Sequence, residues 1–351
     1  MGRQVGFGVI GCGYIAQAEH LPAFQSIPEA NLVAVADINE ALAKRAAKTY
    51  GAKYWFKDYR DLLKIDEVEA VEILTPHYPI DTHPQICIDA AEAGKHVLVE
   101  KPMATTIEAA SDMVEACKRQ NIHLAVAYPH RYDSFIWKSK RLIENGDLGR
   151  LLSCLSLFVG WSLRPYYFAL KTRNSKSNRN LEQNSGQIDP LLEMLLNASI
   201  HHLNLIRFFL GDPTEVQADV RRDRAEIIME FPGDLIATHV YAHVSPCEGV
   251  NQIHLFGDEA YLEVHFGKPH FPYSFPSLTI RRAEKSDQAI KIDGFITPYW
   301  NPFRKEIEYF ARCILEDKRT LSEGEDSLKD IKLIYSVFEA ARKKKRITVK
   351  Y

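Results

Sequence analysis

The residue of this chain best suited to chemistry is Lys101, in the sequence Glu100-Lys101-Pro102. It directly follows a short apolar run, His96 to Val99, that is typical of a parallel β-strand. A lysine there would lie at the carboxyl end of the strand, where open α/β sheets bind their ligands. The pKa of lysine also falls readily when its charge is desolvated. We therefore interpret Lys101 as a candidate acid/base, with a surface lysine as the alternative.

A motif near the amino terminus indicates a dinucleotide site. Residues 11–16, Gly-Cys-Gly-Tyr-Ile-Ala, fit the pattern GxGxxG/A between an expected strand and an expected helix. The first glycine would make the tight turn, the second would let a pyrophosphate approach, and the small last residue would let helix and strand pack closely. The alternative is a tight turn without a ligand. The candidate cofactor residues of this motif are Gly11, Gly13, Tyr14, Ile15 and Ala16.

An acid follows this turn at the expected distance. Asp37 lies 26 residues after Gly11, at the end of the next expected strand, which is where a ribose-binding carboxylate belongs. A carboxylate would repel a 2′-phosphate, and no arginine directly follows it. The sequence therefore favours NAD as the cofactor over NADP.

A third candidate site lies on one predicted helix, Leu191 to Leu210, which ends at Gly211. Because it is apolar almost all round, we expect it to be buried. Its exceptions recur at helical spacing and predict one polar stripe: Glu193, Asn197, His201 and Asn204. His201 is the natural acid/base, since its unperturbed pKa is near neutrality. A satisfied core histidine is the alternative, and it is our interpretation of His202.

The elements that would position these residues differ between the two parts of the chain. Residues 1–127 alternate strand and helix patterns, which predicts a Rossmann domain with a doubly wound parallel sheet. Its expected strands are Val5–Ile10, Leu32–Ala36, Val68–Leu74, His96–Val99 and Leu124–Ala127. Its expected helices are Tyr14–Ser26 (loosened at Pro22), Glu40–Tyr50, Pro84–Ala93 and Ile107–Gln120, the last opened by a capping box of Thr105 and Glu108.

Residues 128–351 are expected to form an α+β domain with a mostly antiparallel, open sheet. Its expected strands are Leu151–Val159, Glu215–Val220, Glu226–Phe231, Ala237–His243, Gln252–Phe256, Ala260–Val264 and Leu278–Arg282. Further helices are expected at Trp137–Asn145, Phe303–Glu316 and Glu325–Lys343. One face of this sheet should be free to pair with another subunit, so we expect a homodimer or homotetramer.

Composition narrows the class of function. The formal net charge of −2 argues against nucleic acid or a membrane surface as a partner. No run is apolar enough to span a membrane, no signal-peptide pattern is visible, and the six cysteines contain no CxxC pair. We therefore expect a cytoplasmic protein. The histidines lack a recognisable ligand spacing, so we predict no catalytic metal.

Taken together, these motifs resemble the two-domain family of glucose–fructose oxidoreductase, inositol dehydrogenase and MocA-like proteins. The resemblance covers nearly the full length. The motifs that carry it are the 11–16 turn, Thr75-Pro76, Gly94-Lys95-His96-Val97 before Glu100-Lys101-Pro102, His130-Arg131-Tyr132 before Gly146-x-x-Gly149, Ile200-His201-His202-Leu203 closing at Gly211, and Asn301-Pro302-Phe303.

The resemblance implies an NAD(P)-dependent oxidoreductase acting on a small polyhydroxylated substrate, a sugar, cyclitol or sugar derivative. Lys101 would lie near the nicotinamide and the reacting carbon–oxygen bond, and the Lys101-Pro102 peptide is a candidate for the cis form. Thr75, Pro76 and Glu100 would lie on the cofactor side. His130 and Arg131 would face substrate, although a structural ion pair is equally open for Arg131. His77 and His83, after Thr75-Pro76, receive no role.

The chain departs from its relatives at the stripe. An inositol-dehydrogenase-like pattern would read Asp-x-x-x-His-x-x-Asp, where this chain has Asn197, His201 and Asn204. His201 would then be either a weaker base or only a hydrogen-bonding contact for substrate, with the two asparagines as further substrate contacts. Lys101 would carry more of the proton transfer. Two alternatives stay open: an enzyme that keeps NAD bound and uses it transiently, and a non-catalytic dinucleotide-binding regulator. The basic segment 171–184 is expected to be a solvated loop or a cover for an acidic substrate.

Overall fold

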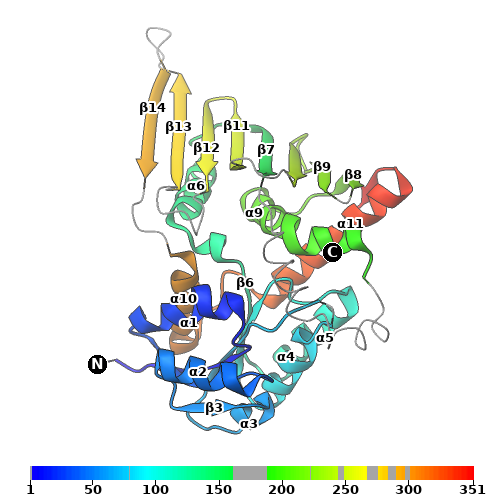
Figure 1. The fold of residues 1–351 in the computed structure, drawn as a ribbon. Coiled ribbons are helices and arrows are strands. Elements are labelled where there is room, and N and C mark those ends of the chain that lie inside the picture. Colours follow the sequence, from blue (N-terminus) through cyan, green and yellow to red (C-terminus); the bar gives the residue numbers. More distant parts are fainter. Residues whose placement is uncertain are drawn as a thin grey trace. The chain divides into compact units, whose positions relative to one another are not determined.

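The computed structural model describes residues 2–78, 80–160, 188–221, 223–243, 249–266, 276–283, 290–296 and 301–351. The expected 171–184 loop lies outside these residues. The chain divides into two compact units (Figure 1). Unit 1 contains Met1–Tyr132 and Asn301–Ile331, and unit 2 contains Asp133–Trp300 and Lys332–Tyr351.

Unit 1 is built on a parallel six-stranded sheet in the order β3-β2-β1-β4-β5-β6. Its strands are β1 (Val5–Ile10), β2 (Ala30–Ala36), β3 (Tyr54–Phe56), β4 (Ala70–Ile73), β5 (His96–Glu100) and β6 (Leu124–Ala127). The order reverses beside β1, so the carboxyl ends of β1 and β4 flank the switch point where doubly wound sheets bind ligands. The predicted Rossmann fold is confirmed.

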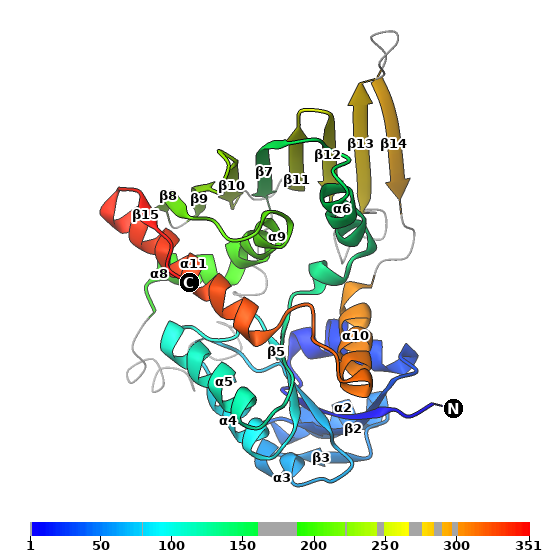
Figure 2. The same cartoon turned by 180° about the vertical axis from the view of Figure 1, so that it is seen from behind.

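The helices of unit 1 mostly follow the expected pattern. They are α2 (Glu40–Tyr50), α3 (Tyr59–Leu63), α4 (His83–Glu92) and α5 (Ile107–Arg119), and α4 and α5 lie side by side (Figure 2). The helix expected after β1 is irregular, with a π turn η1 (Ala16–His20), α1 (Leu21–Ala23) and a 3₁₀ turn η2 (Phe24–Ser26). The π turn ends at His20, two residues before Pro22, which has no N–H to give to a regular helix.

The capping box expected at Thr105 is wrong by one residue. Thr106 caps α5, with an extended backbone and a side chain that accepts a hydrogen bond from the N–H of Ala109. The third helical position is therefore alanine, and Glu108 does not complete a box. The N–H of Thr105 instead donates to Asp81 Oδ2 at 2.6 Å.

A segment far along the chain completes the core of unit 1. Helix α10 (Pro302–Glu316) contacts β1, β2, η1 and the 3₁₀ turn η3 (Pro129–Tyr132). Its buried residues Ile307, Phe310 and Ala311 join the same apolar cluster as Phe7 of β1. The first unit therefore also contains residues 301–331, which the domain boundary expected at 127/128 does not include. The reason is that the amphipathic helix α10 buries its apolar face against the amino-terminal sheet.

Unit 2 holds a nine-stranded sheet in the order β14-β13-β12-β11-β7-β10-β9-β8-β15. Its strands are β7 (Leu151–Val159), β8 (Glu215–Arg221), β9 (Arg224–Glu230), β10 (Ile236–Ala242), β11 (Val250–Gly257), β12 (Ala260–His265), β13 (Ser277–Ala283), β14 (Ile290–Ile296) and β15 (Ile347–Thr348). Of the pairings between these strands, β7 with β10 is parallel and the others are antiparallel. The predicted mostly antiparallel sheet is confirmed.

Helices cover one face of this sheet. Helix α6 (Ser134–Glu144) packs on β12 and β13, and α9 (Ile200–Leu210) packs on β7, β10 and α6. Before α9 come α8 (Pro190–Met194) and a π turn, η5 (Leu195–Ser199), and α11 (Gly324–Lys343) begins in unit 1 and ends in unit 2. Across the described part of the chain, no helix combines the length and apolar character that a membrane span requires.

Candidate active site

The two glycines of the 11–16 turn have different surroundings. Gly11 has φ +98°, and a Cβ there would lie 2.8 Å from the carbonyl carbon of Leu74 and 2.9 Å from the amide nitrogen of Thr75. Only glycine fits this conformation and this close contact with the end of β4. A Cβ on Gly13 would meet nothing within 4 Å, so the backbone here faces open space. Ala16 is fully buried in the core, as its small size predicts.

The turn presents an open cradle at the start of a helix. Tyr14 is exposed and Ile15 is half-buried at the head of the helical segment. Backbone N–H groups at a helix amino terminus are the usual partners of a dinucleotide pyrophosphate. The space beside Gly13 and the helix that follows it therefore fit the cofactor expected from the sequence.

Asp37 is held against the same turn. Its Oδ2 accepts a hydrogen bond from the N–H of Cys12 at 2.8 Å, and its Oδ1 accepts one from the N–H of Asn39 at 2.7 Å. Burial, and then the charge of Asp37, raise the pKa of the Cys12 thiol to about 12. The carboxylate is thus fixed at the carboxyl end of β2 by backbone donors, and the neighbouring thiol stays protonated.

The loops after β4 and β5 are joined by a buried histidine that the sequence did not indicate. One ring nitrogen of His83 lies 2.6 Å from the carbonyl oxygen of Thr75, and the other lies 3.0 Å from that of Pro102. Carbonyl oxygens only accept, so each ring nitrogen donates when both bonds form. Thr82 also donates its hydroxyl to Thr75 Oγ1 at 2.8 Å. His83 therefore ties the Thr75-Pro76 segment to the Lys101-Pro102 turn.

Lys101 lies at the carboxyl end of β5, half-buried, as its motif predicts. The Lys101-Pro102 peptide is cis, which confirms the sequence-based expectation. The N–H of Lys101 donates to Glu100 Oε2 at 3.0 Å. Burial opposes ionisation of Glu100, but His20, Lys101 and His83 lower its pKa below the usual value. Glu100 is thus a carboxylate directly beside the candidate acid/base.

His77 is the second histidine of this edge for which the sequence gave no role. Burial, and then the positive charges of Lys101 and His83, lower the pKa of His77 to about 3. Its ring therefore stays neutral throughout the physiological range. Pro76 and Tyr78 on either side of it are exposed, so this segment lies at the surface of unit 1.

The polar stripe in unit 2 is shorter than its spacing predicts. The helix runs from Pro190 to Leu210, as expected, but it contains the π turn η5. In a regular α-helix, the side chains of Glu193 and His201 would be about 80° apart around the helix axis. The extra residue of a π turn changes this angle by about 100° in the opposite direction. Glu193 and His201 therefore face nearly the same side. Asn197, between them, donates from Nδ2 to Glu193 Oε1 at 3.5 Å.

Asn204 leaves this stripe. Its exposed fraction is 1%, whereas Glu193, Asn197 and His201 are each partly exposed. The rotation introduced by the π turn carries Asn204 toward the core side of α9. We therefore correct the expected four-residue stripe to three residues.

His202 is a core histidine, as expected. Its Nδ1 lies 2.7 Å from Ser156 Oγ and its Nε2 lies 2.9 Å from Asn251 Oδ1. The ring stacks on Phe158 and His239. These contacts account for the polar atoms of the imidazole without a ligand.

His130 and Arg131 lie in η3 of unit 1. Burial lowers the pKa of His130 to about 4. Arg131 is 3% exposed, and its Nη1 lies 2.7 Å from both Asp326 Oδ2 and the carbonyl oxygen of Leu321. These contacts favour the structural ion pair among the two roles that the sequence left open for Arg131.

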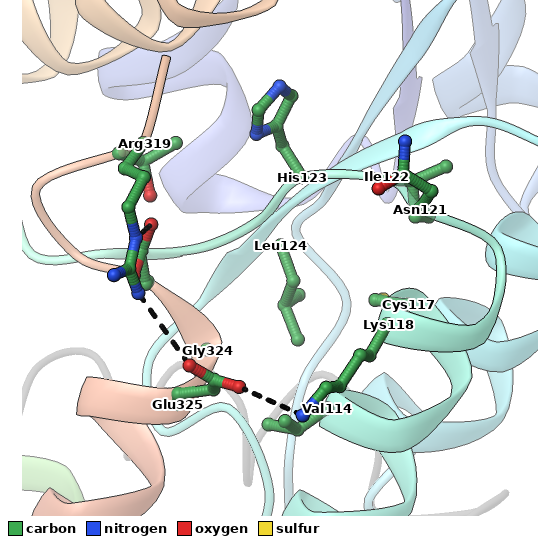
Figure 3. Close-up of a pocket in the computed structure, with 12 residues that line it drawn as sticks. Val114, Cys117, Lys118, Asn121, Ile122, His123, Leu124, Arg319, Gly324 and Glu325 are labelled. Carbon is green, nitrogen blue, oxygen red and sulfur yellow. Dashed lines mark hydrogen bonds and ion pairs between the residues drawn. The ribbon is translucent and has the colours of Figure 1, made fainter. Parts of the chain in front are cut away.

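The pocket drawn in Figure 3 lies elsewhere in unit 1. It is lined by the end of α5, the start of β6 and residues 319–325, and Glu325 forms ion pairs with Arg319 and Lys118. The start of β6 is at the amino-terminal edge of the sheet, opposite the edge that carries Lys101. This pocket is therefore separate from the candidate site. Among the described residues, no group of three or more His, Cys, Asp or Glu is arranged to hold a metal ion.

Comparison with known proteins agrees with this arrangement. A model described as an oxidoreductase family with an NAD-binding Rossmann fold matches residues 5–128. A second, described as the C-terminal alpha/beta domain of the oxidoreductase family, matches residues 140–350.

Similar proteins span nearly the full chain. D-xylose 1-dehydrogenase (NADP(+)) of Haloarcula marismortui is 28% identical over 96% of this chain and 91% of its own length. The NAD(+)-dependent scyllo-inositol 2-dehydrogenase of Bacillus subtilis is 26% identical over 91% of this chain and 88% of its own. The structure of levoglucosan dehydrogenase in complex with NADH and levoglucosan has a TM-score of 0.83 at 21% identity, covering 99% of this chain and 100% of that one. That likeness supports the fold.

Proposed function

The chain belongs to the oxidoreductase family with an NAD-binding Rossmann fold, and from this premise we propose that Lys101 is its principal acid/base and NAD its preferred cofactor. As a member of that family it is an NAD(P)-dependent oxidoreductase that acts on the CH–OH groups of sugars or related polyols. The observation that carries the proposal is the bridge from Thr75 through His83 to Pro102, because it joins the loop against the dinucleotide turn to the turn that holds Lys101.

The residues of unit 1 suit NAD. The cradle beside Gly13 would receive the pyrophosphate, and Asp37 would accept hydrogen bonds from the ribose hydroxyls. Both oxygens of Asp37 accept backbone N–H groups, which fix the carboxylate beside the turn, where its negative charge would oppose a 2′-phosphate. The next residue, Ile38, is exposed and offers no positive charge to such a phosphate.

A bound nicotinamide would supply hydride transfer, and Lys101 would accept or donate the accompanying proton. Its neutral amine accepts the proton of the substrate hydroxyl during oxidation, and its ammonium returns a proton to the oxygen during reduction. The ammonium also stabilises negative charge that develops on that oxygen. His77, whose pKa is lowered by burial and then by the charges of Lys101 and His83, stays neutral and adds no positive charge of its own at this edge. We propose that His201 orients the substrate in unit 2, with Asn197 beside it on the same stripe.

The test replaces Lys101 by methionine, which keeps the length of the side chain and removes the amine. We expect Lys101→Met to bind NADH as the wild type does, measured by NADH fluorescence, and to lose about 10²- to 10⁴-fold in turnover. Lys95→Met is the matched control, because Lys95 precedes the opposite end of β5 and donates to the carbonyl oxygen of Ile65. Retained turnover in Lys101→Met would refute the proposed role.

The substrate screen uses sugars, cyclitols and sugar nucleotides with NAD and NADP. We propose a small polyhydroxylated molecule as substrate, because the family acts on such molecules and because the partly exposed stripe on α8 to α9 offers hydrogen-bonding side chains. If the protein binds NADH but oxidises none of these compounds, the result would instead support the alternative of a non-catalytic dinucleotide-binding regulator.

We also propose that the protein forms a homodimer or homotetramer in the cytoplasm. The sheet face of unit 2 opposite α6 and α9 exposes large apolar side chains, and such patches mark interfaces. By strand register these lie on one face: Ile228, Ile236, Phe256, Ile292 and Ile296. Light scattering after size-exclusion chromatography should give a mass of at least twice 40.1 kDa.

A further inference from the structure

A cluster of ionisable side chains lies inside unit 1, behind the Lys101 turn. His20, Glu72 and Glu306 are fully buried, and Glu100 is 9% exposed. They come from four different elements: η1, which follows the dinucleotide turn, and β4, α10 and β5. No motif of the sequence indicated His20, Glu72 or Glu306, and the chemistry proposed above uses none of them.

The contacts form a chain that ends at Lys101. His20 Nδ1 lies 2.7 Å from Glu72 Oε1, and His20 Nε2 lies 3.3 Å from Glu100 Oε1. The second oxygen of Glu100 accepts the backbone N–H of Lys101 at 3.0 Å. His20 is therefore separated from the Lys101 backbone by a single carboxylate.

The charges of the cluster balance around His20. Burial opposes protonation of the imidazole, but Glu72 and Glu100 outweigh it and raise the pKa of His20 well above 6.5. Burial raises the pKa of Glu306 well above its usual value, with Glu100 and Glu72 adding to the effect and His20 opposing it. The cluster thus holds an imidazolium between Glu72 and the carboxylate of Glu100, with Glu306 as a neutral acid. Lys101 and His83 are the other charged or titratable groups that act on Glu100.

Stability does not explain such a cluster. Removing charges from water is costly, and a well-packed set of apolar side chains is often at least as stable as a buried ion pair. The ring of Phe303 packs edge-on against His20 at 5.0 Å, so the surroundings of the imidazole are partly apolar already. Stability alone therefore gives no reason for charged side chains at this position.

We propose that His20 is a positioning residue: it acts through Glu100 to fix the Lys101 turn and to balance the negative charge beside the Lys101 ammonium. The inference rests on the acid/base role proposed for Lys101. With the imidazolium present, Glu100 already has a buried counter-charge and attracts the proton of Lys101 less. Without it, the carboxylate would hold the ammonium form of Lys101, and the amine needed for oxidation would form only at higher pH.

The experiment measures the pH profile of kcat/KM for oxidation in His20→Gln. We expect NADH to bind within about threefold of the wild type. The acid limb of the profile should move upward by about one pH unit, which corresponds to the loss of one nearby counter-charge. His96→Gln is the matched control, because His96 is a partly buried histidine at the opposite end of β5, whose Nδ1 accepts the N–H of His123. This variant should keep the wild-type limb.

A second variant gives the opposite sign and does not require His20 to be replaced. Glu100→Gln keeps an oxygen that can accept the Lys101 N–H but removes the negative charge, so the acid limb should move downward. In the double variant, His20→Gln should cause no further upward shift, since the carboxylate through which it acts is absent. If His20→Gln does not fold, His20→Asn, which is smaller and equally uncharged, takes its place and should give the same upward shift.

An unmoved limb in the His20 variant would overturn the proposal, and so would an equal shift in His96→Gln. This outcome is distinct from failure of the proposed function. Full turnover in Lys101→Met would remove the acid/base role itself, whereas unmoved limbs in an enzyme that needs Lys101 would remove only the role of His20.

Discussion

Asp37 Oδ2 lies 2.8 Å from the backbone nitrogen of Cys12 and accepts its hydrogen bond. This bond connects the carboxyl end of β2 to the centre of the glycine-rich turn, two elements that a cofactor must contact together. It also uses one oxygen of the carboxylate, while Oδ1 accepts the N–H of Asn39. Carboxylate oxygens have further lone pairs, so both can still accept ribose hydroxyls.

The first prediction concerns cofactor choice. Asp37→Asn keeps an oxygen for the Cys12 N–H but removes the negative charge that would face a 2′-phosphate. We expect the preference for NADH over NADPH to fall by about tenfold or more, equivalent to about 1.4 kcal/mol. Fluorescence titrations with both cofactors measure it. Asp61→Asn, at an exposed acid of α3 that pairs with Lys64, is the control and should leave both affinities unchanged. A wild-type preference for NADPH would contradict the assignment.

Much of the fold could be predicted because its signals are local. Helix α2 has the expected bounds because Asn39 caps it, its side chain accepting from the N–H of Ala41, and Gly51 ends it in the left-handed conformation. Strands β3, β14 and β15 and the short helix α3 were missed. Two of these strands and α3 are only two to five residues long, too short to show periodicity.

Other differences have long-range or conformational causes. The packing of α10 into unit 1 depends on partners that are some 300 residues away in sequence, such as Phe7 and Phe310. The burial of Asn204 follows from a π turn that residue spacing does not reveal. Regular α-helical spacing therefore predicted Asn204 on the partly exposed polar stripe, whereas the residue is buried.

The candidate site shows the same division. The glycine turn, Asp37 and the Lys101 motif are sequence-local and could be recognised. The pairs His83 with Pro102 and His20 with Glu72 are 19 and 52 residues apart, and no pattern connects their members. What could have indicated His20 is its place seven residues after Gly13, on the side of the expected helix that also carries buried Ala16. A polar residue on a buried face needs a partner.

The second prediction concerns acid stability. Burial lowers the pKa of His239 in β10 to about 3, from 6.5 in the unfolded chain. The contribution of the neutral ring to the free energy of unfolding is complete above pH 6.5. It is lost as the pH falls toward 3, because only the unfolded state gains the proton in that range. At pH 5 the loss amounts to about 2 kcal/mol. His239→Gln keeps a partner for the Ser156 hydroxyl. The free energy of unfolding of the wild type falls between pH 7 and pH 5, and in His239→Gln this fall should be smaller by about 2 kcal/mol.

Denaturant unfolding at the two pH values measures this difference. An NMR titration of the His239 ring in the wild type is an independent check, and it should show no protonation above pH 5. A ring that titrates near 6.5 would contradict the prediction, as would an unchanged pH dependence in His239→Gln.

The last prediction separates folding from cofactor binding within one turn. A methyl group on Gly11 would lie 2.8 Å from Leu74 and would require an alanine at φ +98°, so Gly11→Ala should destabilise unit 1 by about 1–3 kcal/mol. A methyl group on Gly13 meets no protein atom within 4 Å, so Gly13→Ala should fold as the wild type does. It would occupy the space that a pyrophosphate needs, and we expect NADH affinity to fall at least about tenfold. Thermal unfolding and NADH titration of both variants measure the two effects. If Gly13→Ala keeps wild-type affinity for NADH, the cradle is not where the pyrophosphate binds.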